Sequence, residues 1–311
     1  MVPLFTADTV YEAVPPSRAV DAVRDAFVAY ARGEWTMPPK TYVGAYPAGD
    51  FRAMPALGAG HALLKWVTSF PGNPARGLPT VMGVVLVSSA EDGRLVAVLD
   101  AGAVTAVRTG AAAVVAAEAL GRADAETAAV VGAGVNGEAA ARTFAARGRT
   151  PLVWDVDGAR AAEVADRVGG RVASSRDEAL AAELLVTVTP GREILLPEGS
   201  LRPGRHVSLM GADGPGKAEI APAELARVRV FCDDWEQASH GGECAAAVEA
   251  GLLTRGDVTD LGRVLTGDAE GRRSPEDATA FDSTGLALQD LAVALAALER
   301  ADELDLPTIP L

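Results

Sequence analysis

Residues 127–155 read TAAVVGAGVNGEAAARTFAARGRTPLVWD and decide the fold of the central part of this chain. The apolar run 128–131 predicts a buried strand, and the Ala-rich stretch after the glycines predicts a helix. Between them lies Gly132-Ala133-Gly134-Val135-Asn136-Gly137, which has GxGxxG spacing. A second apolar run, 152–154, ends in Asp155, 21 residues after the middle glycine. Strand, glycine turn, helix and distal acid together are typical of a dinucleotide-binding βαβ unit.

The glycine turn has a physical requirement at each position. Gly132 lets the chain turn sharply after the strand, and Gly134 lets a pyrophosphate approach the backbone because it has no side chain. Gly137 lets the helix pack closely on the sheet. The first N–H groups of that helix, around Val135 and Asn136, would then face the phosphates.

Asp155 determines which dinucleotide is expected. Its carboxylate would accept hydrogen bonds from the ribose hydroxyls and repel a 2′-phosphate, so NAD is expected rather than NADP. The alternative interpretation of the whole segment is a glycine-rich turn in an ordinary α/β unit.

Composition limits the classes of protein that the chain can represent. Its 311 residues exceed one ordinary domain, and 49% of them are hydrophobic, enough for a sizeable core. The formal charge of −14 argues against nucleic acid or an anionic membrane surface as a partner. Cys232 and Cys244 have neither disulfide-framework nor metal-site spacing, and the three histidines are scattered, so no metal is expected. Such cysteine usage, an N-terminus unlike a signal peptide and no uninterrupted apolar run of 18 residues favour the cytoplasm, without membrane contact.

The rhythm of apolar segments changes near residue 120. After it, strand-like runs alternate with helical segments, at 128–131, 152–154, 171–173, 184–188, 205–210 and 228–232. This alternation predicts a parallel sheet with right-handed crossovers. Before it, helical patterns over 17–31 and 103–120 enclose strand-like runs at 62–68, 80–88 and 95–99.

The expected fold class is therefore α/β, with a Rossmann-type doubly wound parallel sheet and a smaller α+β domain. Residues 121–284 would form the NAD-binding domain. Residues 1–120 and 285–311 would form a substrate-binding and dimerisation domain, to which the final apolar helix returns.

Three basic residues are candidates for binding the carboxylate of an amino or imino acid substrate: Lys40, Lys65 and Arg108. Hydride transfer needs a substrate held in place and a proton carrier for its nitrogen. Lys65 interrupts the apolar run ALLKWVTSF, so its side chain either reaches solvent or faces a polar cleft. Arg108 lies in an otherwise apolar helix, where a buried guanidinium needs an anionic partner. The alternative to a ligand there is an internal salt bridge.

Two segments follow predicted parallel strands, at the edge where ligands bind in open α/β sheets. Asp213, in LMGADGPGKAEI, is a candidate proton carrier, with a plain turn acid as the alternative. Thr187, Val188 and Thr189 end another strand and are candidates to line the nicotinamide pocket, unless they are a simple strand end.

Together these segments resemble the ornithine cyclodeaminase/mu-crystallin family over nearly the whole chain. The similar segments are MPPKTY, LLKWVTSFPGN, GLPTVMG, VTAVRTGAAA, VVGAGVNG, LMGADGPGKAE, DDWEQASHGGE and FDSTGLALQD. The family comprises ornithine cyclodeaminases, archaeal-type L-alanine dehydrogenases and cyclic ketimine reductases. The resemblance implies a homodimer built through the N-terminal domain.

The resemblance also implies roles for residues at matching positions. Lys40, Lys65 and Arg108 would bind the substrate carboxylate, and Asp213 would hold or deprotonate the substrate nitrogen, or activate water. The cofactor phosphates would be approached by Thr80, Arg108 and Thr109. Ser283 lies in a segment similar to the cofactor-side loop of the family.

One departure bears on the reaction. Arg52 stands two residues before Met54-Pro55, where ornithine cyclodeaminases carry a Glu that handles the distal amine. The resemblance therefore favours the alanine dehydrogenase or ketimine reductase type, and DDWEQASHGGE with FDSTGLALQD looks most like the archaeal-type alanine dehydrogenase branch. The expected reaction is hydride transfer between NAD and the Cα of a small L-amino acid or its imine. In reverse, the enzyme would reduce an imine formed from a 2-oxo acid and an amine, or a cyclic ketimine. The alternatives are an ornithine cyclodeaminase, which forms L-proline and ammonia, and a non-catalytic NAD(P)-binding protein.

Overall fold

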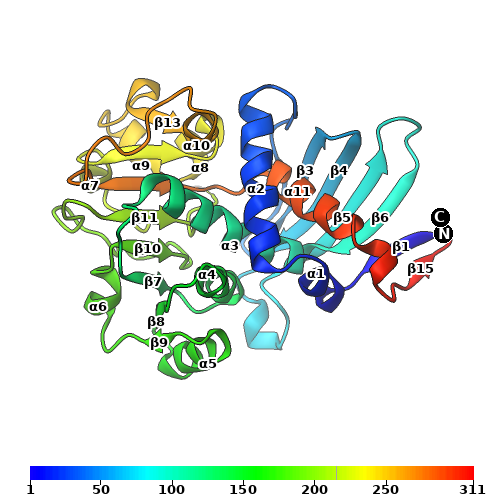
Figure 1. The fold of residues 1–311 in the computed structure, drawn as a ribbon, viewed down its shortest axis with the longest axis horizontal. Coiled ribbons are helices and arrows are strands. Elements are labelled where there is room, and N and C mark those ends of the chain that lie inside the picture. Colours follow the sequence, from blue (N-terminus) through cyan, green and yellow to red (C-terminus); the bar gives the residue numbers. More distant parts are fainter. Residues whose placement is uncertain (215) are drawn as a thin grey trace. The chain divides into compact units, whose positions relative to one another are not determined.

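Two groups of residues are distinguished by their contacts in the computed structural model, which describes residues 1–214 and 216–311 (Figure 1). Unit 1 comprises Met1–Arg108 and Leu286–Leu311, and unit 2 comprises Thr109–Gly285. The first boundary falls inside helix α3 (Ala101–Leu120), at residue 108 rather than at the predicted 120.

Close packing explains why the second half of α3 belongs to unit 2. A Cβ on Gly110 would lie 2.6 Å from the backbone of Ala139, so the two segments approach with no room for a side chain. The Ser208 hydroxyl also donates a hydrogen bond to the carbonyl oxygen of Ala113 at 3.0 Å. The sequence pattern shows only that α3 is one apolar helix, and it does not show where along the helix the contacts change.

Unit 1 contains a seven-stranded sheet in the order β15-β1-β6-β5-β4-β3-β2. Its strands are β1 (Val2–Phe5), β2 (Thr41–Ala45), β3 (Gly49–Gly58), β4 (His61–Ser69), β5 (Val81–Ser89), β6 (Leu95–Asp100) and β15 (Thr308–Ile309). Strands β2 to β6 form an antiparallel meander, and β1 adds to β6 in parallel. The other elements are α1 (Ala7–Ala13), α2 (Pro16–Ala31), α11 (Ala287–Leu298) and the 3-10 helices Asn73–Arg76 and Ala301–Glu303.

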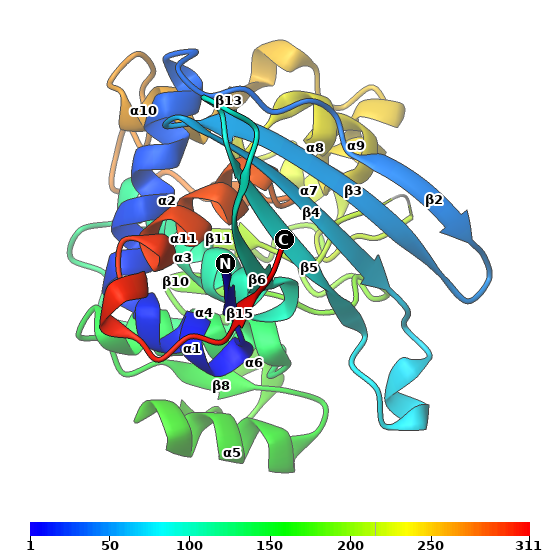
Figure 2. The same cartoon turned by 90° about the vertical axis from the view of Figure 1, so that its right-hand side faces the viewer.

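Alternating side chains give the sheet of unit 1 two different faces. Leu63, Lys65 and Val67 of β4 are buried, whereas Leu64 and Trp66 between them are exposed. Helix α11 contacts β3, β4, β5 and α2, and Figures 1 and 2 show α2 and α11 side by side. The final helix therefore returns to the N-terminal part of the chain, as predicted from its apolar surface.

Unit 2 contains an eight-stranded parallel sheet in the order β13-β12-β14-β11-β10-β7-β8-β9. Its strands are β7 (Ala128–Val131), β8 (Leu152–Trp154), β9 (Arg171–Val172), β10 (Leu184–Thr187), β11 (His206–Leu209), β12 (Arg229–Cys232), β13 (Val258–Asp260) and β14 (Thr279–Asp282). Its helices after α3 are α4 (Val135–Ala146), α5 (Gly158–Val168), α6 (Arg176–Leu180), α7 (Pro222–Leu225), α8 (Trp235–Gly241), α9 (Cys244–Glu249), α10 (Leu261–Leu265) and the 3-10 helix Arg255–Asp257. The fold class is the predicted one, comprising a doubly wound parallel sheet and a smaller α+β unit.

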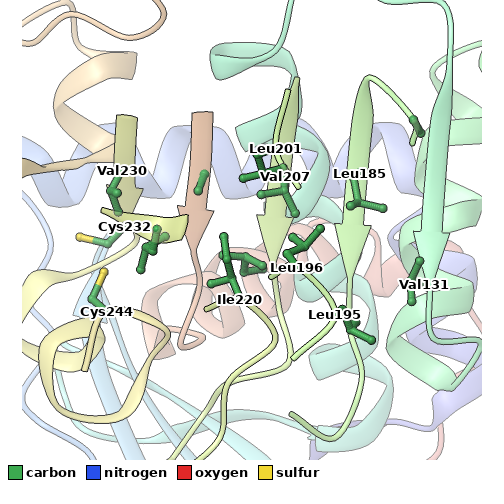
Figure 3. Close-up of a cluster of buried hydrophobic side chains, with 14 of the residues drawn as sticks. Val131, Leu185, Leu195, Leu196, Leu201, Val207, Ile220, Val230, Cys232 and Cys244 are labelled. Atoms are coloured by element: carbon green, nitrogen blue, oxygen red, sulfur yellow. The ribbon is translucent and has the colours of Figure 1, made fainter. Parts of the chain in front are cut away.

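The strand order of unit 2 reverses direction between β7 and β10. From β7 the chain adds β8 and β9 on one side, and then returns to add β10, β11 and the remaining strands on the other. Crevices at such a switch point, beyond the carboxyl ends of the strands, bind ligands in open α/β sheets. Figure 3 shows the apolar cluster on one side of this sheet, where Leu195, Leu196 and Ile220 pack near Val207.

Six strands have no predicted run of their own: β2 and β3 lie within residues 34–60, where only short strands and turns were expected, and the other four were not predicted. β13 and β14 follow the last predicted run, and β1 and β15 lie at the chain ends. β14 reads only TAFD, too short for a periodic signal, yet it lies between β11 and β12 with every residue buried. Residues 236–250 have a helical sequence pattern, but they form two short helices, α8 and α9, and the chain is extended at Gly242 between them.

Helix α3 is the one helix of the described residues that is long and apolar enough to cross a membrane by length and composition. Arg108 and Glu118 interrupt it, which is why a search for uninterrupted apolar runs does not find it. Within the fold 83% of its apolar window is buried.

Candidate functional site

The glycine turn after β7 has the geometry predicted for it. Gly132 has a φ of +104°, which L side chains rarely adopt, and α4 begins directly after Gly134. A Cβ on Gly137 would lie 1.7 Å from the carbonyl oxygen of Gly132, so helix and turn touch backbone to backbone. A Cβ on Gly134, by contrast, would meet no heavy atom of the described residues within 4 Å.

Asp155 lies beside this turn. Trp154 is opposite Val131 in the sheet, which brings the residues that follow each of them to the same edge. One carboxylate oxygen of Asp155 accepts a hydrogen bond from the Ala133 N–H at 2.6 Å, and the other accepts one from the Asp157 N–H at 2.8 Å. Each oxygen has a second lone pair, so the carboxylate keeps the capacity to accept from a ribose hydroxyl.

The segment after β10 reaches the same edge. Thr187 is opposite Val131, and the Val188 N–H donates to the Val131 carbonyl oxygen at 2.9 Å. The Thr187 side chain is buried, and its hydroxyl donates to Glu219 at 2.7 Å. At Thr187 the structure therefore shows an internal contact, the simple strand end considered from the sequence. Val188 and Thr189 are half-buried after the strand.

Glu219 is a residue of this edge that the sequence analysis missed. Its buried carboxylate accepts hydrogen bonds from the Thr187 hydroxyl, the Thr189 N–H and hydroxyl, and the Gly211 N–H, at 2.6–3.0 Å. Burial raises the pKa of Glu219, and the hydrogen bonds from Thr189, Thr187 and Gly211 act in the opposite direction. Glu219 thus ties together the loops that follow β10 and β11. No sequence signal distinguishes it, because its partners lie in segments brought together only by the sheet.

Asp213 and Ser283 also follow strands at this edge. Asp213 lies after β11, half-exposed, and accepts an ion-paired hydrogen bond from Lys217. Ser283 follows β14, whose last residue is opposite Leu209 at the end of β11. The Ser283 side chain is buried, and its hydroxyl donates to Asp233 at 3.1 Å. Pro215, in the loop of Asp213, lies outside the described residues.

Unit 1 carries a separate cluster of buried charges around Lys65. Lys65 is only 1% exposed, so it does not reach solvent. Its Nζ donates to Asp290 Oδ1 at 2.9 Å, and Arg108 Nε lies 3.5 Å from the same oxygen. Burial lowers the pKa of Lys65 to about 8, and the charges of Arg108 and Arg52 add to this, whereas Asp290 opposes it. For Arg108 the structure shows the internal ion pair that was considered from the sequence.

Arg52 is a second residue that the sequence analysis did not place in a site. It is on the same face of β3 as Met54, which is opposite Lys65. Its Nε donates to Asp50 at 2.6 Å, and its guanidinium lies 5.4 Å from the centre of the Tyr42 ring. The alternation along β3, counted from Met54, is the signal that places it on the face of Lys65.

The other three predicted residues are scattered. Lys40 directly precedes β2, in which Thr41 is opposite Ala53 of β3. Lys40 therefore lies at about the same level along the strands as Met54 and its partner Lys65. Thr80 precedes β5 and is five residues before Val85, the partner of Lys65, which is about 17 Å along a strand. Thr109 is buried in unit 2, and its hydroxyl has no hydrogen-bond partner among the described residues.

The edge of unit 2 fits a dinucleotide. Helix α4 starts without a side-chain cap, so N–H groups of its first turn remain available to a phosphate. Gly134 leaves open space beside them, and Asp155 provides an acceptor. Within residues 1–214 and 216–311, no group of three or more His, Cys, Asp or Glu side chains is placed to hold a metal ion.

Comparison with known proteins agrees with this geometry. The chain matches the ornithine cyclodeaminase/mu-crystallin family over residues 4–304. An alanine dehydrogenase of Archaeoglobus fulgidus is 38% identical over 311 residues, covering 96% of this chain and 94% of the relative. An iminosuccinate reductase of Paracoccus denitrificans is 34% identical, covering 75% of this chain and 74% of the relative. A solved structure, an archaeal alanine dehydrogenase dimer with bound NAD, has a TM-score of 0.91 at 38% identity and covers 97% of this chain and 96% of its own.

Proposed function

Because the chain belongs to the ornithine cyclodeaminase/mu-crystallin family, we propose that it is an NAD-dependent oxidoreductase of small L-amino acids or their imines. The observation that carries the proposal is the burial of Lys65, with its pKa lowered to about 8, in a chain whose other unit has a dinucleotide turn. A buried amine that titrates near neutral pH is typical of a functional site, since a merely structural lysine keeps its charge in water.

The charges around Lys65 suit one carboxylate group. Lys65, Arg108 and Arg52 carry three positive charges, and Asp50 and Asp290 carry two negative ones. Before Lys40 is counted, these five side chains therefore leave one positive charge, which the carboxylate of a substrate would neutralise. Lys40 would add a point-charge contact rather than a bidentate one. We therefore propose Lys40, Lys65 and Arg108, with Arg52 beside them, as the substrate-binding set.

The cofactor residues are proposed from unit 2. Gly132, Gly134, Gly137 and the first N–H groups of α4 would hold the pyrophosphate, and Asp155 the ribose. Further contacts are proposed from Thr80, Arg108, Thr109, Thr187, Val188, Thr189 and Ser283. The hydroxyl hydrogens of Thr187 and Ser283 are already donated to carboxylates. We therefore propose that these two residues contact the cofactor only through their backbone, or through hydrogen bonds that their hydroxyl oxygens accept. When bound, NAD supplies the acceptor and donor of hydride.

The protein side chains hold the substrate and move its protons. Lys65, Arg108 and Lys40 would orient the carboxylate and thereby fix the direction of the Cα hydrogen. Asp213 would hold the substrate nitrogen, take its proton, and orient the water that attacks the iminium. A pKa of about 8 lets Lys65 give up or accept a proton in the same pH range.

The proposal is tested by an absorbance screen for NADH formation across L-amino acids, in which Lys65→Ala is the test variant. Lys65→Ala is expected to reduce turnover by orders of magnitude while NAD still binds, because the lysine lies in unit 1 and the glycine turn in unit 2. Arg94→Ala, which removes an exposed arginine of the same unit, is the control and should leave turnover unchanged. Native turnover by Lys65→Ala would contradict the substrate-binding role.

The same screen separates the two alternatives. Proline and ammonia from L-ornithine, without accumulation of NADH, would identify a cyclodeaminase. Against that reaction stands Arg52, which places a guanidinium where those enzymes carry a carboxylate for the distal amine. NAD binding without turnover of any amino or 2-oxo acid would identify a non-catalytic binding protein.

We also propose that unit 1 forms a homodimer through the face of its sheet opposite Lys65. The exposed apolar side chains of this face are Val43, Leu57, Leu64, Trp66 and Met82, which are 37–52% exposed. No helix of unit 1 covers these strands in the view of Figure 2, among the described residues. An apolar patch of this kind on one sheet face is typical of an interface.

The two buried thiols suit a reducing compartment, and we infer a cytoplasmic location.

Light scattering after size exclusion tests the dimer. Trp66→Asp is expected to give monomers, because it places a charge in the centre of the buried patch. Val156→Asp, which changes an apolar residue of unit 2 that is 87% exposed, is the control and should keep the native mass. A Trp66→Asp protein that remains dimeric would exclude this face.

A further inference from the structure

We propose that Asp290 is a positioning residue, which orients Lys65 and Arg108 for substrate through one shared carboxylate oxygen. This proposal rests on the function proposed for Lys65 and Arg108, and it adds a residue of helix α11 to that site. Asp290 would not touch the substrate itself. It would act through the two cations that do.

The contacts of Asp290 are directed at the two cations. Asp290 lies in the first turn of α11 and is completely buried. Its Oδ1 accepts from Lys65 Nζ at 2.9 Å and lies 3.5 Å from Arg108 Nε. The neighbouring Gln289 accepts from Arg108 Nη1 at 3.4 Å and from the Leu286 N–H at 3.2 Å. One helical turn therefore holds two of the three cations that are proposed to bind the carboxylate.

Three buried polar atoms around this pair remain without a hydrogen-bond partner in the described part of the chain. They are Asp290 Oδ2, Arg108 Nε and Gln289 Nε2. Structural ion pairs in a protein interior normally have their hydrogen-bonding capacity used, since a buried polar atom without a partner destabilises the fold. A cluster with three such atoms is incomplete by itself, which is typical of a site that is completed by a ligand or by water.

The electrostatics give Asp290 a measurable effect on Lys65. The charged groups that act on Lys65 are Asp290 from α11, Arg108 from α3 and Arg52 from β3. Asp290 raises the pKa of Lys65, whereas burial, Arg108 and Arg52 lower it. Removal of the Asp290 charge therefore moves the pKa of Lys65 further below about 8. Lys65 would then lose its proton at a lower pH, and the binding of the substrate carboxylate would weaken at that pH as well.

Lysine resonances measure this effect without any assay of activity. The chain has three lysines, Lys40, Lys65 and Lys217, so labelling with ¹³Cε-lysine gives a simple spectrum. The Lys65 signal is expected to titrate near pH 8 in the native protein and at least about one pH unit lower in Asp290→Asn, because removal of a buried opposite charge shifts a pKa by that order. Asp290→Glu, which keeps the charge, should return the pKa of Lys65 most of the way to its native value. Glu299→Gln, which removes an exposed carboxylate from the other end of α11, is the control and should leave the titration unchanged.

Activity provides the second measurement. With the amino acid found in the NADH screen, kcat/KM of Asp290→Asn should fall at least tenfold at pH 8, and its alkaline limb should move to lower pH. The NAD dissociation constant should stay within twofold. A loss of thermal stability with an unchanged Lys65 titration and an unchanged pH profile would overturn the proposal and make Asp290 purely structural. A shifted titration in a protein that turns over no amino acid would support the Asp290 contact and instead contradict the proposed function.

Discussion

Two glycines of the same turn should respond to alanine in opposite ways. Gly137→Ala places a Cβ 1.7 Å from the Gly132 carbonyl oxygen, whereas Gly134→Ala places one in open space. The first substitution therefore tests how closely α4 packs on the turn. The second tests whether that open space is where a pyrophosphate lies.

The cost of Gly137→Ala follows from the overlap. Real Cβ atoms essentially never come within 3.0 Å of a neighbour, so the backbones of α4 and the turn must separate by about 1.3 Å. Overpacking of a well-packed interior costs about 1–3 kcal/mol, and we expect the upper end because both partners are backbone. For a unit of this size, about 3 kcal/mol corresponds to a fall of about 6–12 °C in Tm. For Gly134→Ala we expect a loss of less than about 1 kcal/mol, from the weaker cap alone.

Thermal unfolding and NAD titration by intrinsic fluorescence separate the two effects. Gly134→Ala should melt close to the native protein while its NAD Kd rises at least tenfold, which is about 1.4 kcal/mol of binding energy. Gly137→Ala should lose stability first and NAD affinity as a consequence. Native NAD affinity of Gly134→Ala would refute the assignment of the phosphate site, and a native Tm of Gly137→Ala would refute the close packing.

Three other substitutions give independent tests. Asp155→Ser should raise the affinity for NADP relative to NAD at least tenfold, measured as the ratio of the two Kd values, because a carboxylate repels a 2′-phosphate; an unchanged ratio would contradict its role. Burial raises the pKa of Asp282 to about 7, so the contribution of Asp282 to the free energy of unfolding should fall as the pH rises. Burial lowers the pKa of His206 to about 3, so the contribution of His206 should rise with pH. Each contribution changes by at most about 1.4 kcal/mol per pH unit. Both contributions act across about pH 4–6.5 and oppose each other in the native protein. Relative to the native protein, His206→Gln should therefore make stability fall more steeply with pH, and Asp282→Asn should make it fall less steeply or rise, in urea unfolding at pH 4.5 and 6.5; slopes equal to the native one would show that these two groups do not titrate as stated.

The strand and helix pattern of unit 2 is largely local information. Its glycine turn, the distal Asp155 and six of its strands are each visible in a short stretch of sequence, because alternation and glycine placement reflect backbone geometry within that stretch. β14 is the counterexample. It is a central strand whose four residues carry no pattern of their own, and its place follows from the pairing with β11 and β12.

The predicted site residues also fall into two groups, those whose role depends on nearby sequence and those whose role depends on packing between distant segments. Gly132 and Gly137 have local roles, and the structure shows the geometry they require. For Lys65 the sequence leaves solvent or a polar cleft open, and only the packing of α11 on β4 decides that its partner is Asp290. Glu219 likewise has no local signal, although it holds two loops of the cofactor edge.

By itself, the sequence determined the fold class, the dinucleotide turn and the resemblance to one family, because each depends on residues near one another in the chain. The tertiary structure decided which charges are paired. Lys65 and Asp290 are 225 residues apart in sequence and 2.9 Å apart in space. A buried charge needs a partner wherever the fold can supply one, and the identity of that partner depends on how a helix and a strand pack. The sequence therefore made Lys65 a candidate site residue, and the structure showed which residue is paired with it.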